Sequence, residues 1–342
     1  MIGRDKIVPK GLGFIQHQGR RDYQEDSCGF EISGDGGDKF AIIALADGMG
    51  GHVGGAAASK IAVETALDKM SELTALPKEN LAEDLSERVE LANASIISKL
   101  EEEPSLSGMG TTLVLLSVQK QGYFFASVGD SPLWIYRNDE FIRLNADHSM
   151  VPVLEDMVEA GRMTEEDASR DSMRNSLRSA LVGEEIDLLD ISDEIITSNP
   201  NDILILASDG LQTLSDEEIS ELIAPELDAQ ELAELLNNSV LAKKTSNQDN
   251  ITVAVVKMAD FFSQPGTLVS KEVEKIEEKV DEEEPVTQPL KRPSRTEEPA
   301  AKKTKNVIFV IILTLMILAI LGYVFFINPP ENVILEPIEG AK

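Results

Sequence analysis

The sequence predicts an α+β domain with layered antiparallel sheets in residues 1–258, followed by a linker and a membrane-spanning helix. Short runs rich in β-branched and aromatic residues alternate with helical patterns throughout this domain. Between residues 111 and 137, three such runs follow one another without a helical pattern between them. Connections this short allow hairpins but not parallel crossovers, which need a dozen or more residues. A layered α+β domain with antiparallel sheets therefore fits best.

Six strands and six helices are expected in this domain. The strands are expected at 39–46, 111–118, 123–129, 133–137, 202–208 and 250–258. The helices are expected at about 55–70, 78–101, 151–160, 164–169, 216–224 and 229–242. Asp216, which precedes a Glu-Glu-Ile-Ser run, is interpreted as the start of a capped helix.

Composition excludes some function classes. The 342 residues include 61 Asp and Glu against 31 Lys and Arg, so nucleic acid is not expected as a partner. Cys28 is the only cysteine, which excludes a disulfide within the chain and favours a reducing compartment. The first residues lack the apolar core of a signal peptide.

The C-terminal part predicts a membrane anchor. Residues 259–306 are charge-dense and then Pro-rich, as in a cytoplasmic linker. Residues 307–327 carry no charge, and a helix of this length spans roughly 30 Å, the thickness of the hydrocarbon core. Six Lys and Arg residues between 291 and 305 precede it, whereas the tail 328–342 has three Glu residues and only one Lys. The positive-inside rule then places the large domain in the cytoplasm, on a single-pass inner-membrane protein.

Acidic residues stand where the predicted strands end or begin. Asp47-Gly48 and Asp209-Gly210 each follow an apolar run and a small residue, in matching contexts. Asp130 follows another predicted strand and Asp249 precedes one, and the segment RRDYQEDS near the start supplies Glu25 and Asp26. Each Asp-Gly alone is explained by a turn. As a set, carboxylates brought together repel one another unless cations or protons neutralise them.

The ligand types indicate which cation. Oxygen ligands from Asp, Glu and main-chain carbonyls suit Mg²⁺ or Mn²⁺. A His-rich zinc site is not expected, because the chain has only His17, His52 and His148 and no His-Glu-x-x-His motif. The glycine loop after Asp47 is not a dinucleotide loop either, since Val53 stands where the third glycine of that motif belongs. A phosphate-binding Walker loop is also absent from the sequence.

The ordered set of motifs resembles the metal-dependent Ser/Thr protein phosphatases of the PP2C (PPM) family, bacterial branch. The matching segments, across about residues 11–258, are RRDYQEDS, ALADGMGGHVGG, GMGTTLVLL, ASVGDSPLWIY, NADHS, EAGRMTEEDASRDSMRNSLRSALVG, ILILASDGL and QDNITVAVV. The resemblance implies an α-β-β-α sandwich of two antiparallel sheets flanked by helices. It also implies that residues 149–183 form a variable flap beside the active site.

The resemblance assigns site residues to a centre of two Mn²⁺ or Mg²⁺ ions. The implied metal ligands are Asp47, the Gly48 carbonyl, Asp209, Asp249, Asp26 and Glu25. Asp47 is expected to bridge both ions. A third, weaker metal is expected at Asp130 with Asp209. Arg21 corresponds to the arginine that binds the substrate phosphate, and Arg20 is the alternative.

The implied reaction is hydrolysis of phosphoserine and phosphothreonine in proteins by a water that bridges the two metals. His52 is a candidate general acid, with the alternative that it supports the metal site as a loop histidine. Met49 stands where the animal branch has its histidine. Pro132 replaces the arginine usual after Gly-Asp-Ser, which removes a charge near Asp130, and Gln24 replaces the usual Asn or Met.

The expected partners are phosphoproteins, a cognate bacterial Ser/Thr kinase and the membrane. Two other functions stay open at this point. One is a catalytically silent, membrane-tethered module that binds phosphoproteins, which loss of metal ligands would indicate. The other is a hydrolase of small phosphoesters or cyclic nucleotides.

Overall fold

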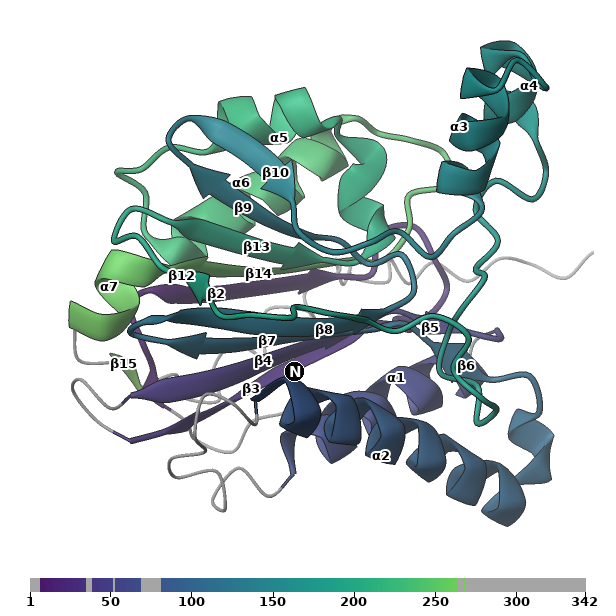
Figure 1. Cartoon of the computed structure of the whole chain (residues 1–342), viewed down its shortest axis with the longest axis horizontal. Coiled ribbons are helices and arrows are strands. Elements are labelled where there is room, and N and C mark those ends of the chain that lie inside the picture. The colour runs from purple at the N-terminus through teal and green to yellow at the C-terminus, as the bar shows by residue number, and fades with distance from the viewer. Residues whose placement is uncertain (1–6, 35–38, 52, 69–80, 264–266, 269–342) are drawn as a thin grey trace, which may run out of the picture. The chain divides into compact units, whose positions relative to one another are not determined.

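The structure, a computed structural model, describes residues 7–34, 39–51, 53–68, 81–263 and 267–268 (Figure 1). No helix among these residues is long and apolar enough to cross a membrane. The predicted anchor at 307–327, its tail at 328–342 and nearly all of the linker at 259–306 lie outside the described residues. The anchor therefore stays a prediction.

Two antiparallel sheets form the centre of the described part (Figure 1). The first has the order β11-β8-β7-β4-β3, with β12 also paired to β8. Its strands are β3 (Ser27–Ser33), β4 (Phe40–Ala46), β7 (Leu113–Gln119), β8 (Gly122–Val128), β11 (Asp190–Ile191) and β12 (Ile196–Thr197). The second has the order β10-β9-β13-β14-β2. Its strands are β2 (Leu12–His17), β9 (Leu133–Arg137), β10 (Glu140–Arg143), β13 (Ile203–Ala207) and β14 (Ile251–Lys257).

Helices cover the outer face of each sheet (Figure 1). On the first sheet lie α1 (Val53–Leu67) and α2 (Leu81–Glu102), and on the second lie α5 (Asp216–Leu222) and α6 (Ala229–Ala242). Two further helices, α3 (Val151–Glu159) and α4 (Glu165–Arg170), project away from the sandwich within the predicted flap at 149–183. The short α7 (Met258–Ser263) follows β14. The α-β-β-α sandwich is therefore confirmed.

Small ladders complete the topology. Antiparallel pairs join β1 (Ile7–Val8) to β15 (Thr267–Leu268), and β5 (Gly48–Met49) to β6 (Gly110–Thr111). One short 3₁₀ turn, η4 (Pro104–Leu106), follows α2, and another, η5 (Asp209–Thr213), follows β13.

The six predicted strands and six predicted helices all exist. The prediction missed α7, the two-residue strands β1, β5, β11, β12 and β15, and three longer strands, β2, β3 and β10. Each of these three strands lies at an edge of its sheet. Their residues are only partly buried, with β10 alternating between exposed and half-buried positions. An edge strand has less surface to bury than a central one, so its sequence lacks the continuous apolar run by which β4, β7, β8, β13 and β14 were predicted.

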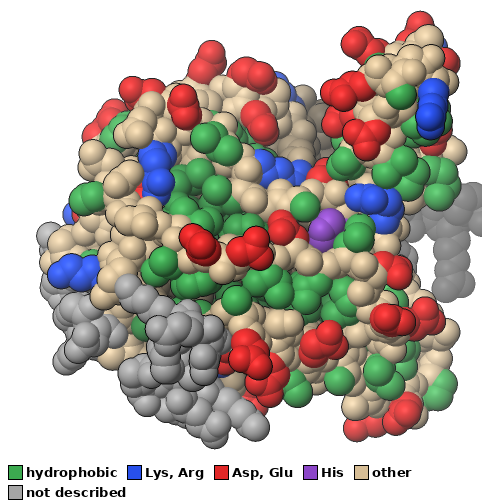
Figure 2. All heavy atoms as spheres, viewed as in Figure 1, with side chains coloured by type: hydrophobic (Ala, Val, Ile, Leu, Met, Phe, Trp, Pro, Cys, Tyr) green, Lys and Arg blue, Asp and Glu red, His purple; other side chains and the backbone are tan. Residues whose placement is uncertain are grey.

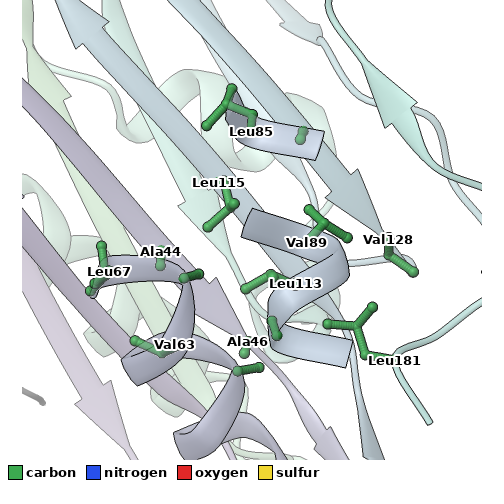
Figure 3. Packing of buried hydrophobic residues seen from close by; sticks show 14 of the residues in the cluster. Ala44, Ala46, Val63, Leu67, Leu85, Val89, Leu113, Leu115, Val128 and Leu181 are labelled. Atoms are coloured by element: carbon green, nitrogen blue, oxygen red, sulfur yellow. The ribbon is translucent and has the colours of Figure 1, made fainter. Parts of the chain in front are cut away.

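The strand β4 shows how one segment serves two cores. Successive side chains of a strand point to opposite faces. Ile42, Ala44 and Ala46 belong to the cluster beneath α1 and α2, whereas Ala41, Ile43 and Leu45 pack between the two sheets. Figure 3 shows the first cluster, in which Ala44 and Ala46 lie near Val63 and Leu67 of α1. Burial on both faces explains the unbroken apolar run before Asp47.

Helix starts are set by side-chain caps. The Ser215 hydroxyl accepts a hydrogen bond from the Glu218 N–H at 3.3 Å, and the Glu218 carboxylate accepts one from the Ser215 N–H at 3.1 Å. The cap of α5 is therefore Ser215 and not Asp216, which is the first helical residue. Asp228 and Glu231 cap α6 in the same reciprocal way.

The outer surface is strongly acidic, consistent with a formal net charge of −30. Figure 2 shows many acidic and few basic side chains on the face it draws. Such a surface repels polyanions.

Candidate metal centre

The strand ends that carry the predicted acids lie together at one end of the sandwich. In the first sheet, Ser27 of β3 pairs with Ala46 of β4. In the second sheet, Ala207 of β13 pairs with Val253 of β14. Antiparallel pairing thus places the residues before β3 and β14 beside the residues after β4 and β13. This end is the one at which Figure 1 labels β5 and β6.

Asp47 is held through its main chain. Its N–H donates to Thr112 Oγ1 at 2.9 Å. Its carbonyl accepts hydrogen bonds from the Thr112 N–H and from Thr111 Oγ1, both at 2.9 Å. These three bonds fix the backbone where β4 ends and leave the Asp47 carboxylate free to face the pocket described below.

Asp26 is a buried carboxylate with one oxygen left over. Its Oδ2 accepts a hydrogen bond from Thr252 Oγ1 at 2.7 Å. Its Oδ1 has no hydrogen-bond partner within the described part of the chain. Burial, together with the nearby charges of Asp209 and Asp249, raises the pKa of Asp26 to about 7. A buried oxygen in this position needs a proton or a cation.

The other acids perturb one another in the same way. Burial is the main cause that raises the pKa of Asp47 well above its usual range, and the charges of Asp26 and Asp209 add to it. Burial and the charge of Asp249 raise the pKa of Asp209, whereas the contact with Asp47 and the charge of Arg21 act in the opposite direction. Carboxylates crowded together in this way attract a divalent cation.

The carboxylate oxygens of these acids are not arranged around one common point in the described part of the chain. Within the described ranges, no three His, Cys, Asp or Glu side chains stand at metal-ligand geometry. The unpartnered Asp26 Oδ1 and the mutual pKa shifts nevertheless show that the residues fit a divalent cation: an anionic, oxygen-only set without a neutralising lysine inside it.

Arg21 reaches this set from the solvent side. Its guanidinium donates to Asp249 Oδ2 at 2.5 Å, and the two side chains are 53% and 34% exposed. Arg20 is exposed, and its main-chain N–H donates to the Gln248 carbonyl at 2.8 Å. The structure thus brings the Arg21 side chain to the carboxylates. His52 lies outside the described residues.

Two residues that the sequence assigned no role hold the site together. The amide oxygen of Asn250 accepts from the Glu25 N–H at 2.8 Å. Its Nδ2 donates to the Gln18 and Tyr23 carbonyls at 2.8 and 2.9 Å. Thr112, which holds Asp47, is the second such residue. The position of Asn250 beside Asp249 was the available signal, whereas Thr112 stands in a run that indicates only a strand.

The glycines after the two aspartates are required by crowding. A Cβ on Gly48 would lie 2.2 Å from the Gly55 carbonyl oxygen and 2.4 Å from that of Glu25. A Cβ on Gly210 would lie 1.9 Å from the Asn250 carbonyl oxygen. Neither glycine has a positive φ. Close backbone approach, and not a left-handed backbone conformation, is therefore what requires glycine at both positions.

A cavity of about 520 Å³ opens onto the acidic set. Asp47, Asp130 and Asp209 line one side of it. The other side comes from the predicted flap and the residues after it, including Asn175, Arg178, Glu184 and Asp187. The cavity therefore connects the carboxylates with the flap.

Asp130 occupies the cavity wall beside Asp209. Burial, followed by the charges of Asp209 and Asp147, raises its pKa to about 7, and the charge of Arg143 acts in the opposite direction. Arg143 Nη2 also donates to the Asp130 carbonyl at 2.7 Å. The predicted third-metal pair, Asp130 and Asp209, is thus close enough for each charge to affect the other.

Comparison with known proteins agrees with this geometry. The sequence profile of the family described as "Protein phosphatase 2C" matches residues 16–248. The serine/threonine phosphatase stp of Listeria innocua is 34% identical over 248 residues, which cover 71% of this chain and 94% of that protein. The protein phosphatase PhpP of Streptococcus pneumoniae is 31% identical over 226 residues, which cover 64% of this chain and 85% of that protein.

Solved structures share the sandwich. The Mycobacterium tuberculosis serine/threonine phosphatase PstP/Ppp superposes with a TM-score of 0.58 at 30% identity, covering 72% of this chain and 97% of that one. A structure of the PstP catalytic domain in complex with two manganese ions has a TM-score of 0.56 at 30% identity, covering 72% and 96%.

Proposed function

Since this chain belongs to the protein phosphatase 2C family, we propose that it hydrolyses phosphoserine and phosphothreonine in proteins with two Mn²⁺ or Mg²⁺ ions held by the strand-end carboxylates. One observation carries the proposal. The acids of the family motifs gather at one end of the sandwich, and among them Asp26 Oδ1 is buried without a hydrogen-bond partner. A catalytically silent module would lack some of these carboxylates, whereas this sequence has all of them.

Each carboxylate has its own task in this proposal. Asp47, fixed by Thr111 and Thr112, would hold the cations together with Asp209 and Asp249. Asp26 and Glu25 hold the centre from the β3 side, and the Gly48 carbonyl is the main-chain ligand. The bound cations supply positive charge for the phosphoryl oxygens and lower the pKa of an attacking water.

Arg21 binds the substrate phosphate. Its guanidinium is half-exposed and lies at the edge of the carboxylate set, 2.5 Å from Asp249 Oδ2. A planar guanidinium binds two phosphoryl oxygens at once, which orients phosphorus and neutralises charge that develops during displacement. The ion pair with Asp249 keeps the side chain extended toward the centre.

The leaving serine or threonine oxygen needs a proton. His52 of the glycine loop is the proposed donor. The test is the pH profile of turnover on phosphopeptides and on p-nitrophenyl phosphate, whose leaving group needs little protonation. A loss of rate in His52→Gln that is equal for both substrates would contradict this role.

The principal experiment measures phosphate release from phosphothreonine peptides at rising Mn²⁺ concentration. We expect release that depends on Mn²⁺ in the wild type and falls by about a thousandfold or more in Asp209→Ala, since a metal ligand is lost. Asp228→Ala, which removes only the cap of α6, is the matched control and should retain wild-type turnover. Activity in Asp209→Ala would overturn the metal assignment. Comparing phosphopeptides with small phosphoesters and cyclic nucleotides tests the substrate class.

Two cellular features belong to the same proposal. Residues 307–327 anchor the chain in the inner membrane with the phosphatase domain in the cytoplasm, and there it opposes a bacterial Ser/Thr kinase. Supporting this are the uncharged stretch and the basic residues that precede it. Recovery of the full chain in the soluble fraction without detergent would contradict the anchor. Phosphoproteomics after gene deletion, with rescue by wild type but not by Asp209→Ala, tests the kinase relation.

A further inference from the structure

The segment that carries Asp130 is held by two side chains from the end of β10. Arg143 Nη2 donates to the Asp130 carbonyl at 2.7 Å. Asn145 Nδ2 donates to the Ser131 carbonyl at 3.0 Å, and its Oδ1 accepts from the Leu133 N–H at 2.7 Å. Side chains ten or more residues later in the chain thus form hydrogen bonds with three main-chain groups of the segment 130–133.

Pro132 lies within this segment and limits the hydrogen bonds that it can form. It has no N–H to donate, and its side chain carries no charge. Asp130 itself lines the cavity, close to Asp47 and Asp209.

Arg143 is the basic side chain that contacts this segment in the described residues. Besides its bond to the Asp130 carbonyl, its Nη1 lies 3.3 Å from Asp147 Oδ2. Asp147 is fixed in turn, because its Oδ1 accepts from the Ser149 N–H at 2.8 Å. The Arg143 side chain is only 21% exposed, so water screens its charge less than on an open surface. The guanidinium is therefore fixed between the Asp130 segment and the start of the flap.

We infer that Arg143 is a positioning residue for Asp130: its bond to the Asp130 carbonyl holds the carboxylate on the cavity wall near Asp209, and this sets the affinity of the Asp130–Asp209 pair for a divalent cation. The inference rests on the proposed function, because that function supplies the cation. A hydrogen bond to the Asp130 carbonyl orients the carboxylate by fixing its main chain. The bond to Asp147 prevents the guanidinium from turning into the cavity to neutralise the carboxylates directly.

The test measures Mn²⁺ binding to the full-length protein by titration calorimetry and equilibrium dialysis. The wild type is expected to show a tight class of sites and one weaker site, and Asp130→Ala should abolish the weaker one. Arg143→Met should weaken that site by roughly tenfold, the equivalent of one charge-assisted hydrogen bond. The tight class should stay unchanged. Arg143→Lys keeps the charge without the planar fork and should recover part of the affinity.

Two controls separate positioning from general stability. Arg137→Met breaks a comparable ion pair, that with Asp202, away from the cavity, and should lower the melting temperature without changing Mn²⁺ binding. In the Asp130→Ala background, Arg143→Met should make no further difference to binding. An unchanged weak site in Arg143→Met, or an additional loss in the Asp130→Ala background, would overturn the inference.

The same measurements distinguish a failure of the proposed function from a failure of the role of Arg143. If the wild type binds no Mn²⁺ and releases no phosphate, the proposed function fails. If the wild type does both and Arg143→Met matches it at every site, only the role of Arg143 fails.

Discussion

Two aspartates at opposite ends of the strand β13 are both withdrawn from water, yet their surroundings differ. Asp202 precedes the strand and is fully buried. Arg137 donates to both of its carboxylate oxygens, at 2.7 and 2.6 Å, and the Asn199 N–H donates at 2.7 Å. Asp209 follows the same strand and faces other acids, with its carboxyl hydrogen-bonded to that of Asp47.

The difference separates an acid that is paired within the fold from one that we propose to bind a metal. At the Asp202 end the chain supplies its own cation, so the charge is neutralised on folding. At the Asp209 end the chain gathers carboxylates whose pKa values are raised by burial and by one another. In the proposed function an external cation would neutralise these carboxylates. Four predictions test this contrast, in order of expected effect.

The largest effect is expected from Asp47→Asn. The change keeps the shape of the side chain but removes the charge that bridges the cations. Phosphate release should fall by about a thousandfold or more. In chelator-treated protein, however, the melting temperature should rise, because one of the mutually repelling carboxylates is gone. A fall of the melting temperature in the metal-free variant would contradict the repulsion.

Asp202→Asn is expected to lower the stability of the fold and to leave the Mn²⁺ dependence of the enzyme unchanged. Removing one partner of a buried, hydrogen-bonded pair leaves the Arg137 charge without its partner, and should cost about 3 kcal/mol of unfolding free energy. Urea denaturation measures this cost. The Mn²⁺ dependence of the remaining folded enzyme should match the wild type, and a changed Mn²⁺ requirement would show that the two ends of β13 are not independent.

A smaller loss is expected from Arg21→Met. The proposed phosphate contact disappears, so kcat/KM on phosphopeptides should fall by about a hundredfold, as for other charge-assisted contacts to a developing anion. Mn²⁺ affinity should not fall, since the Arg21–Asp249 ion pair competes with a cation for that carboxylate. Arg20→Met is the matched control and should have a much smaller effect on turnover.

The smallest effect is on the pH dependence of stability. The folded pKa values of Asp26 and Asp130 are raised to about 7, so the native state binds more protons than the unfolded chain between about pH 4 and pH 7. The stability that these two groups contribute to the metal-free protein is therefore greatest below about pH 4. This contribution is lost as the pH rises through 7. Melting temperatures at pH 5, 6, 7 and 8 should fall steadily. Saturating Mn²⁺, or Asp26→Asn, should reduce the slope, and a slope unchanged by both would contradict the assignment.

The sequence predicted the elements whose pattern is local. Central strands such as β4 and β13 are buried on both faces, and this burial makes each a continuous apolar run that can be recognised without knowing its neighbours. Acids directly after these runs, such as Asp47 and Asp209, could then be placed at strand ends. The edge strands β2, β3 and β10 were missed, because partial burial leaves a weaker pattern.

The sequence by itself thus determined the order of the central elements, the family motifs and the acids at the strand ends. Tertiary structure alone decided how those acids are surrounded. Thr252 meets Asp26 across 226 residues, Arg137 meets Asp202 across 65, and Arg143 reaches Asp130 from a neighbouring strand. Such contacts depend on sheet order and register, which join residues distant in the chain. The same residue type is neutralised in an ion pair or left among other acids according to the side chains that the fold brings to it.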